Sequence, residues 1–332
     1  MSHPGLDAEA ADLMARMGSD LAGAPMDPTV EQRRELMTWM CHAYGPPMAR
    51  VKAAQDRWIS TPAGPLRLRI YWPRRFSLKP PGVVLNIHGG GWVLGGPDSY
   101  ERVCRSYCAR GDVIVVDVDY RRAPEHRFPA AIDDCEAALA WVAENARTLG
   151  GDPKRLMVTG DSAGGALAAV ACQGARVPVH RLVLLYPVMT AAPHARFASR
   201  TELGDGRYFL RELDIKRAET EYLNCPSQGE DPRISPLLAD DETLRGHPPT
   251  LVITAEFDPL RDEGRAYADR LQTVGASIEY VCLPGTIHGC VLFSGLLKRG
   301  QAGLDRVARE FARPSRWDLS SISGFPRGSR SD

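Results

Sequence analysis

The sequence predicts an α/β fold with a mostly parallel sheet, helices on both faces of the sheet and an additional helical cap. Short apolar runs alternate with stretches of helical periodicity from about residue 54 onward. Such runs are typical of strands buried on both faces of a parallel sheet, and their alternation with helices indicates a doubly wound core. Residues 1–50 and a later stretch of about 64 residues without a clear strand fall outside this alternation and indicate the cap.

Composition argues against several classes of function. The 332 residues carry 41 basic and 41 acidic side chains, so no net charge favours nucleic acid or an anionic membrane as a partner. No apolar run is long enough to span a membrane, and we expect no secretory signal. The eight cysteines are dispersed without a C-x-x-C pair, which indicates reduced thiols in a cytoplasmic protein rather than disulfides or a zinc site. We therefore expect no metal.

Eight strands and five core helices are expected in chain order. The strands span 54–61, 66–72, 83–87, 113–118, 156–159, 182–186, 251–254 and 278–283. The helices span about 98–109, 129–148, 163–175, 262–274 and 291–311. A proline, an alanine and a glycine at 62–64 indicate a turn, so the first two strands are expected to form a hairpin.

The cap is expected to contain two segments that pack on each other. Residues 1–50 include seven of the nine methionines, and a helix from 31 to 44 would put Leu36, Met37 and Met40 on one face. This face either packs as an ordinary helix or lines a pocket, because thioether side chains adapt to varied apolar groups. The second segment is a helical insertion at 190–235.

The remaining chain forms the core and a tail. The expected core comprises 51–189 and 236–315. The tail, 316–332, is rich in serine, glycine and arginine and has little apolar surface to bury. We predict that it is disordered.

A G-x-S-x-G motif at 160–164 lies between an expected strand and an expected helix. This is the context that a nucleophile elbow requires, in which the serine sits on a strained turn with its hydroxyl exposed. Gly160 and Gly164 would let neighbouring backbone approach closely. The N-terminus of the following helix favours negative charge that develops nearby. Ser162 is therefore the candidate nucleophile.

A second motif, His88-Gly89-Gly90-Gly91-Trp92, follows the third expected strand. Acyl transfer needs N–H donors aimed at an oxyanion, and three adjacent glycines can bring unshielded N–H groups to one place. Gly89, Gly90 and Gly91 are therefore candidate donors, and Trp92 is a candidate substrate-binding residue. The third glycine of a dinucleotide fingerprint is missing. We expect His88 to order the loop through hydrogen bonds rather than to act as a base.

A serine nucleophile needs a base, and the base needs an orienting acid. His288 follows the last expected strand, and Asp258 follows the strand at 251–254. Both lie beyond the carboxyl ends of strands, where α/β sheets place their sites, and the chain order serine, acid, histidine fits this elbow. Glu256 and Asp262 are competing acids. We prefer Asp258 because the proline after it forces a turn.

These motifs resemble those of the hormone-sensitive-lipase-like family of α/β-hydrolases, the bacterial group IV carboxylesterases. The likeness covers about residues 80–295 and includes DYRRAPE at 119–125 and FPAA at 128–131. It departs at Arg122, where the family usually has an apolar residue. The resemblance also suggests that Glu125 has a structural role and anchors the turn that carries it.

The resemblance implies an α/β-hydrolase fold and a serine carboxylesterase that acts on short- to medium-chain esters of small molecules without a cofactor. It assigns the oxyanion donors to the N–H groups of Gly90, Gly91 and Ala163. It assigns the acid and the base to Asp258 and His288. A cap built from the N-terminus and an insertion is also a feature of the family.

Other possibilities stay open from the residues alone. The same triad could hydrolyse an amide or deacetylate a small molecule. A noncatalytic small-molecule-binding protein could use the same fold, although the presence of His288 argues against it. In the insertion, Arg200, Arg207 and Tyr208 either contact a polar substrate or form a solvated surface, and Tyr208 is kept as a candidate substrate-binding residue. A homodimer could form through the sheet edge near 278–283.

Overall fold

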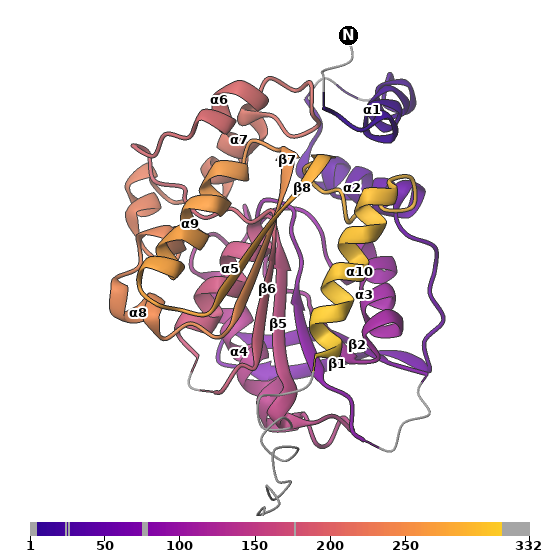
Figure 1. The fold of residues 1–332 in the computed structure, drawn as a ribbon, viewed down its shortest axis with the longest axis vertical. Helices are drawn as coiled ribbons and strands as arrows, with labels where there is room; N and C mark the ends of the chain where they lie inside the picture. Colours follow the sequence, from indigo (N-terminus) through magenta and orange to yellow (C-terminus); the bar gives the residue numbers. More distant parts are fainter. Residues whose placement is uncertain (1–4, 24, 26, 75–78, 176, 314–332) are drawn as a thin grey trace, which may run out of the picture.

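One eight-stranded sheet forms the centre of the computed structural model, which describes residues 5–23, 25, 27–74, 79–175 and 177–313 (Figure 1). The strands are β1 (Ala53–Thr61), β2 (Gly64–Trp72), β3 (Val83–Ile87), β4 (Ile114–Val118), β5 (Leu156–Asp161), β6 (Arg181–Leu185), β7 (Thr250–Phe257) and β8 (Ile278–Ile287). Their order across the sheet is β1-β2-β4-β3-β5-β6-β7-β8. β2 pairs antiparallel with β1 and β4, and every other pairing is parallel. The predicted fold class is confirmed.

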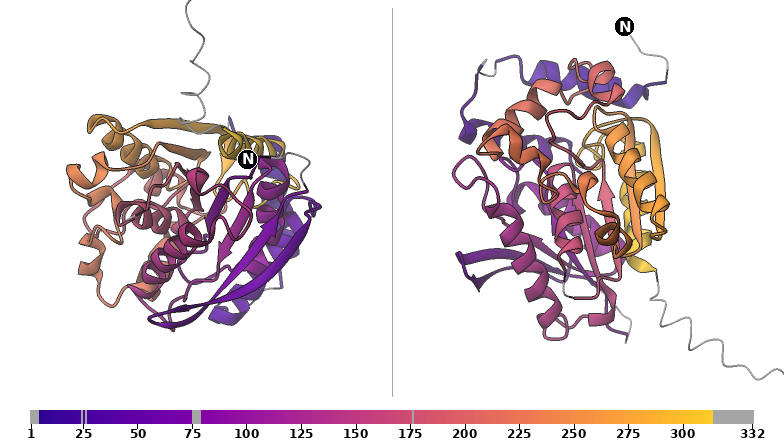
Figure 2. Two further views of the ribbon diagram at one scale, coloured as in Figure 1. Left: turned by 90° about the horizontal axis from the view of Figure 1, so that it is seen from below. Right: turned by 90° about the vertical axis from the view of Figure 1, so that its left-hand side faces the viewer.

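Helices cover both faces of this sheet (Figures 1 and 2). One face carries α3 (Pro97–Gly111) and α10 (Lys298–Ala312). The other face carries α4 (Ala130–Asn145), α5 (Ala163–Gln173) and α9 (Arg261–Thr273). Shorter helical segments are η1 (Pro153–Arg155), η2 (Pro226–Glu230), η3 (Pro236–Leu238) and α8 (Asp241–Arg245).

Alternate side chains of the buried strands enter two different hydrophobic clusters. On β3, Val83, Leu85 and Ile87 pack in the cluster that includes α4, α5 and α9, whereas Val84 packs in the cluster that includes α3 and α10. Successive side chains of a strand point to opposite faces of a sheet. Because both faces are covered, these strands are continuous apolar runs in the sequence.

Four cap helices lie over one end of the core, near the carboxyl ends of the parallel strands (Figures 1 and 2). They are α1 (Ala8–Asp20), α2 (Val30–Tyr44), α6 (Ala198–Leu203) and α7 (Glu212–Tyr222). α2 begins with a capping box, in which Thr29 and Gln32 each accept a backbone N–H of the other. Arg33 of α2 pairs with Glu221 of α7 at 2.6 Å, so the two cap segments are in contact.

The predicted strands are all present, and they differ from the structure only at their ends. The last helix was predicted to begin at 291, but α10 begins at Lys298. Gly295 explains the difference, because its N–H donates to the carbonyl oxygen of Tyr44 at 3.0 Å. A Cβ on Gly295 would lie 2.1 Å from the carbonyl oxygen of Gly45. The chain before α10 therefore packs against the end of α2 as a series of turns and does not continue as one helix.

The structure does not test two of the predictions, which concern the tail and the domain boundaries. The tail, 316–332, lies outside the described residues, and the domain boundaries stay predictions. Within the described residues, no helix has the length and apolar character needed to cross a membrane. All eight cysteines are described, each is a free thiol, and six are buried.

Candidate active site

Ser162 stands on the tight turn between β5 and α5. Its φ is +54°, a left-handed value that strains a residue with a side chain. The turn is held by backbone contacts, since the N–H of Ser162 donates to the carbonyl of Leu185 at 2.9 Å and its carbonyl accepts the N–H of Val188 at 3.0 Å. A Cβ on Gly164 would lie 2.2 Å from the carbonyl oxygen of Ile87. The structure therefore has the strand-to-helix turn that the motif predicts.

Three side chains from three strand ends form a chain of hydrogen bonds. His288 directly follows β8, and Asp258 directly follows β7. His288 Nε2 lies 3.0 Å from Ser162 Oγ, and His288 Nδ1 lies 2.7 Å from Asp258 Oδ2. Asp258 is fully buried, and its Oδ1 accepts the N–H of Leu260 at 2.8 Å. This arrangement lets the imidazole take a proton from the hydroxyl while the carboxylate holds the other ring nitrogen.

The two competing acids have other partners. Glu256 accepts the backbone N–H of Gly285 at 2.7 Å. Asp262 accepts the backbone N–H of Ser199 at 2.9 Å. Asp258 is therefore the carboxylate of the three that meets His288.

The N–H of Gly89 donates hydrogen bonds to buried side chains of the protein. It donates to Asp161 Oδ1 and to the Tyr100 hydroxyl, both at 2.9 Å, and this hydroxyl donates to Asp161 Oδ2 at 2.8 Å. The expectation that Gly89 is an oxyanion donor is therefore wrong. Burial raises the pKa of the Asp161 carboxyl to about 6. Sequence reasoning missed this carboxylate, although its place directly before Ser162 was an available signal.

Gly90 and Gly91 differ from Gly89 because they line the cavity that also contains Ser162. Among the described residues, neither of their N–H groups donates a hydrogen bond to another residue. Ala163 is the first residue of α5. Its N–H therefore has no partner within the helix. These three N–H groups remain the candidates for binding an oxyanion.

His88 belongs to the oxyanion loop, which we define as residues 88–95. Its Nδ1 donates to the carbonyl of Gly89 at 2.9 Å, and its ring stacks on Tyr120 with the centroids 4.2 Å apart. Burial lowers the pKa of His88 to about 3, so the ring is neutral near pH 7. This agrees with the expected role in ordering the loop.

Ser162 lines a cavity of about 390 Å³ that lies between the cap and the core. Its apolar lining includes Leu36, Met37, Met40, Leu210, Ile215, Ala218, Leu292 and Phe293. The methionine-rich face of α2 is thus pocket lining, the second of the two expected alternatives. Trp92 also lines the cavity, and its indole stacks on Tyr222 with the centroids 4.7 Å apart. Within the described residues, no cluster of His, Cys, Asp or Glu side chains could hold a metal ion.

The insertion contributes different residues from those expected. Tyr208 is not in the cavity wall; its ring is buried with its centroid 5.1 Å from that of Phe257. The next residue, Phe209, lines the cavity instead and has a φ of +79°, a conformation that the sequence does not reveal. Arg200 is neither in the cavity wall nor on a solvated surface, because it forms an ion pair at 2.7 Å with the fully buried Glu263.

Comparisons with known proteins identify the family of this chain. A family model described as the alpha/beta hydrolase fold matches residues 84–292. Carboxylic ester hydrolase LipN of Mycobacterium tuberculosis (strain ATCC 25618 / H37Rv) is 39% identical over 278 residues, which cover 80% of this chain and 72% of LipN. Carboxylesterase NlhH of Mycobacterium tuberculosis (strain CDC 1551 / Oshkosh) is 42% identical over 252 residues, which cover 72% of this chain and 78% of NlhH.

A solved structure extends the likeness to the whole fold. Ester hydrolase EH1AB1 from the metagenome of Lake Arreo superposes with a TM-score of 0.86 at 35% identity, covering 92% of this chain and 98% of that chain. The chain therefore belongs to the α/β-hydrolase family, among its hormone-sensitive-lipase-like carboxylesterases.

Proposed function

We propose that the protein hydrolyses carboxylic esters through an acyl-enzyme formed on Ser162. The observation that carries this proposal is the hydrogen-bond chain from Ser162 Oγ to His288 at 3.0 Å and from His288 to Asp258 at 2.7 Å. The serine and the histidine line an apolar cavity large enough for a small substrate. The names of the relatives LipN and NlhH describe ester hydrolases, which supports ester chemistry here.

Acylation and deacylation use the same base. Ser162 Oγ attacks the carbonyl carbon of the ester while His288 Nε2 accepts its proton. Asp258 holds the Nδ1–H and stabilises the imidazolium that forms. As the tetrahedral intermediate collapses, His288 protonates the leaving alcohol and the acyl group stays on Ser162. Water then gives a proton to His288 and attacks the carbonyl carbon of the acyl-enzyme. As this second tetrahedral intermediate collapses, His288 returns the proton to Ser162 Oγ and the free acid is released.

The charge that develops on the carbonyl oxygen is stabilised by the N–H groups of Gly90, Gly91 and Ala163. Ala163 begins α5, so the positive end of the helix dipole adds to the effect of its N–H. One such donor typically lowers the barrier by about 3 kcal/mol. These donors act on the transition state more than on the bound ester, which is the condition for acceleration.

The cavity favours short- to medium-chain acyl or alcohol groups. Its volume of about 390 Å³ is at the small end of the range for ligand sites. Three arginines, Arg33, Arg211 and Arg217, also line the cavity, but each forms an ion pair with a carboxylate of the protein. A neutral ester is therefore the proposed substrate. Rates on p-nitrophenyl esters from acetate to dodecanoate should peak among the shorter chains. A matched p-nitroanilide should be cleaved more slowly than the corresponding ester.

The central experiment removes the nucleophile. Ser162→Ala should reduce hydrolysis of p-nitrophenyl butyrate to the uncatalysed background, and an organophosphate should label the unmodified protein at Ser162 in a one-to-one ratio. Ser60→Ala, on the exposed side of β1, is the matched control and should keep full activity. Hydrolysis that survives in Ser162→Ala would reject the assignment.

Two properties of the whole molecule complete the proposal. A cytoplasmic location is supported by the eight free thiols. A homodimer through β8 is supported by the position of this strand at the edge of the sheet, where backbone groups are open to pairing. Light scattering on the purified protein measures the oligomeric state, and a monomeric mass at high concentration would exclude this dimer.

A further inference from the structure

The carbonyl groups of the oxyanion loop accept hydrogen bonds from the loop between β4 and α4. The carbonyl of His88 accepts from the Tyr120 hydroxyl at 2.9 Å. The carbonyl of Trp92 accepts from the N–H of Ala123 at 3.0 Å. Arg122 donates to the carbonyl of Gly95 at the end of the same loop. The two loops are therefore held together by several side-chain and backbone contacts.

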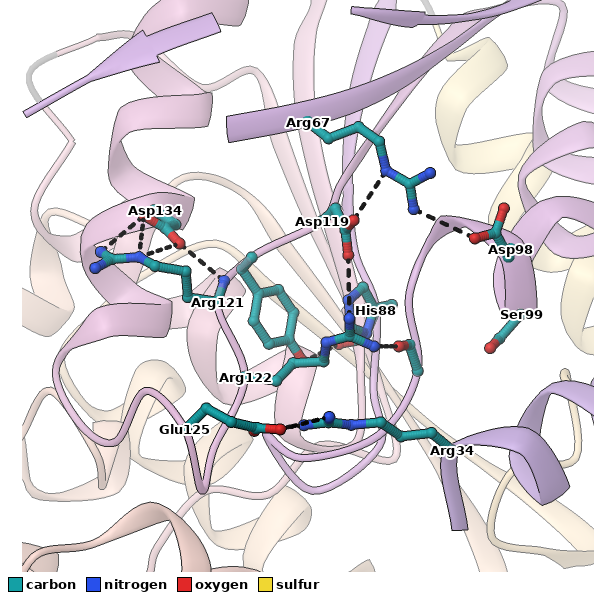
Figure 3. A network of polar contacts seen from close by, with 12 residues as sticks. Arg34, Arg67, His88, Asp98, Ser99, Asp119, Arg121, Arg122, Glu125 and Asp134 are labelled. Atoms are coloured by element: carbon teal, nitrogen blue, oxygen red, sulfur yellow. Dashed lines mark hydrogen bonds and ion pairs between the residues drawn. The ribbon is translucent and has the colours of Figure 1, made fainter. Parts of the chain in front are cut away.

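Arg34 on cap helix α2 contacts both of these loops. Its Nε donates to the carbonyl of Val93 at 2.9 Å, and one terminal nitrogen donates to the carbonyl of Ala123 at 3.0 Å. Its two terminal nitrogens also bind the two carboxylate oxygens of Glu125, each at 2.7 Å (Figure 3). Glu125 thus links the turn that carries it to the cap helix. The Arg34 guanidinium lowers the pKa of Glu125 to about 2.

Val93 is part of the tight turn that orients the candidate oxyanion donors. The N–H groups of Val93 and Leu94 donate to the carbonyl of Gly90 at 3.2 and 2.8 Å. The carbonyl of Gly90 and the N–H of Gly91 belong to one planar peptide group. Fixing this carbonyl therefore fixes the direction of the Gly91 N–H. Arg34 holds the outer end of the turn through the carbonyl of Val93.

An adjoining side of the same helix forms part of the substrate cavity. Met37, Met40 and Cys41 of α2 line the cavity. Thr38, one helical turn after Arg34, also contacts the core, because its hydroxyl lies 2.8 Å from that of Ser99 in α3. A displacement of α2 would therefore change the cavity wall and the Arg34 contacts together.

We propose that Arg34 is a positioning residue, which couples the seating of cap helix α2 to the orientation of the Gly91 N–H in the oxyanion hole. This inference rests on the proposed ester hydrolase function. The cap then completes the geometry that stabilises the transition state, in addition to enclosing the substrate. Arg34 contacts neither the substrate nor the reacting atoms in this scheme.

The test compares two arginines that tie the same part of the cap to the core. Arg34→Met removes the donors and keeps the apolar stem. Arg102→Met is the matched control, because Arg102 of α3 donates to the carbonyl of Pro46 just after α2 at 3.1 Å and does not contact the oxyanion loop. Arg34→Met should lower kcat by about tenfold with KM unchanged, as expected for one charge-assisted hydrogen bond. Arg102→Met should keep the kcat of the unmodified protein.

Two further measurements separate positioning from simple stabilisation. A trifluoromethyl ketone binds serine hydrolases as a tetrahedral adduct, so its affinity should fall by the same factor as kcat in Arg34→Met. Hydrogen exchange in the absence of substrate should become faster over residues 88–95 in Arg34→Met and not in Arg102→Met. A variant that only melts at a lower temperature, with kcat, ketone affinity and loop exchange unchanged well below its melting point, would overturn the proposal.

A milder variant covers the case in which Arg34→Met does not fold. Arg34→Lys keeps the charge, but a single ammonium does not reproduce the guanidinium fork that reaches Val93 and Glu125 together, so kcat should fall about threefold. An unchanged kcat and ketone affinity in a folded Arg34→Lys variant would overturn the proposal. Hydrolysis that does not depend on Ser162 would instead reject the proposed function, while the exchange comparison would still test the link between Arg34 and the loop.

Discussion

The turn that carries Ser162 and the oxyanion loop lie side by side but are held by different kinds of contact. The turn depends on backbone groups that touch one another, because Gly164 has no side chain to keep them apart. The oxyanion loop depends on side chains from other segments, among them Tyr120 and Arg34. A local motif can therefore specify the turn, whereas the loop needs the assembled core and cap. Substitutions in the turn should therefore change the free energy more than substitutions in the loop.

The largest effect is expected where backbone meets backbone. Gly164→Ala places a Cβ 2.2 Å from the carbonyl oxygen of Ile87 and should lower the free energy of unfolding by about 3 kcal/mol, with loss of ester hydrolysis. Gly18→Ala in α1 is the control, because no atom lies within 4 Å of its added Cβ. It should raise the stability by up to about 1 kcal/mol. Urea unfolding measures both, and equal stability of the two variants would contradict the comparison.

The second effect concerns the buried imidazole of His88 in the oxyanion loop and the pH dependence of the free energy of unfolding. Burial lowers the pKa of His88 from 6.5 to about 3, so between these values the unfolded chain binds a proton that the folded chain does not. The contribution of His88 to stability is complete above pH 6.5 and is lost as the pH falls towards 3. Between pH 6.5 and pH 5 the loss should be about 2 kcal/mol.

The variant His88→Gln isolates this contribution, because glutamine does not titrate. Its free energy of unfolding, measured with urea at both pH values, should fall by about 2 kcal/mol less than that of the unmodified protein over the same interval. An identical pH dependence in the two proteins would show that His88 is not the source.

The third effect concerns the close packing of the oxyanion loop against cap helix α7. Gly91 has a φ of +61°, and a Cβ on it would lie 2.9 Å from Cβ of Ala218 in α7. Gly91→Ala should raise the activation free energy of hydrolysis by about 1.5 kcal/mol, which corresponds to a roughly tenfold loss of kcat. Adding Ala218→Gly removes the close contact and should restore part of the activity, whereas Ala218→Gly alone should leave kcat nearly unchanged. No recovery in the double variant would mean that the backbone conformation accounts for the whole loss.

The smallest effect removes one hydrogen bond and keeps the packing. Tyr120→Phe deletes the donor to the carbonyl of His88 while leaving a ring to stack on the imidazole. One neutral hydrogen bond contributes about 1 kcal/mol, so kcat should fall about fivefold or less. Steady-state kinetics on p-nitrophenyl butyrate measure this. A loss of ester hydrolysis as large as that in Gly164→Ala would mean that the loop tolerates substitution no better than the turn.

Much of the fold was predictable because its signals are local. Six strands follow from apolar runs and the first two from the turn between them at 62–64, and the ends of β5, β7 and β8 place Ser162, Asp258 and His288 at one edge of the sheet. The pairing of the triad follows from this placement. The candidate substrate-binding residue of the insertion was placed one position too early, at Tyr208 instead of Phe209, because backbone dihedral angles decide where neighbouring side chains point.

The sequence by itself determined the sheet, the strained serine and the acid and base that meet it, because each depends on the residue types within one strand end or turn. The glycine motif alone left three N–H groups as candidates, and the tertiary structure excluded Gly89, since its N–H donates to a carboxylate 72 residues later in the chain. It also decided that Arg34 holds Val93, 59 residues away. Contacts of this kind depend on how separate elements pack against each other, and no local pattern of residues records that packing.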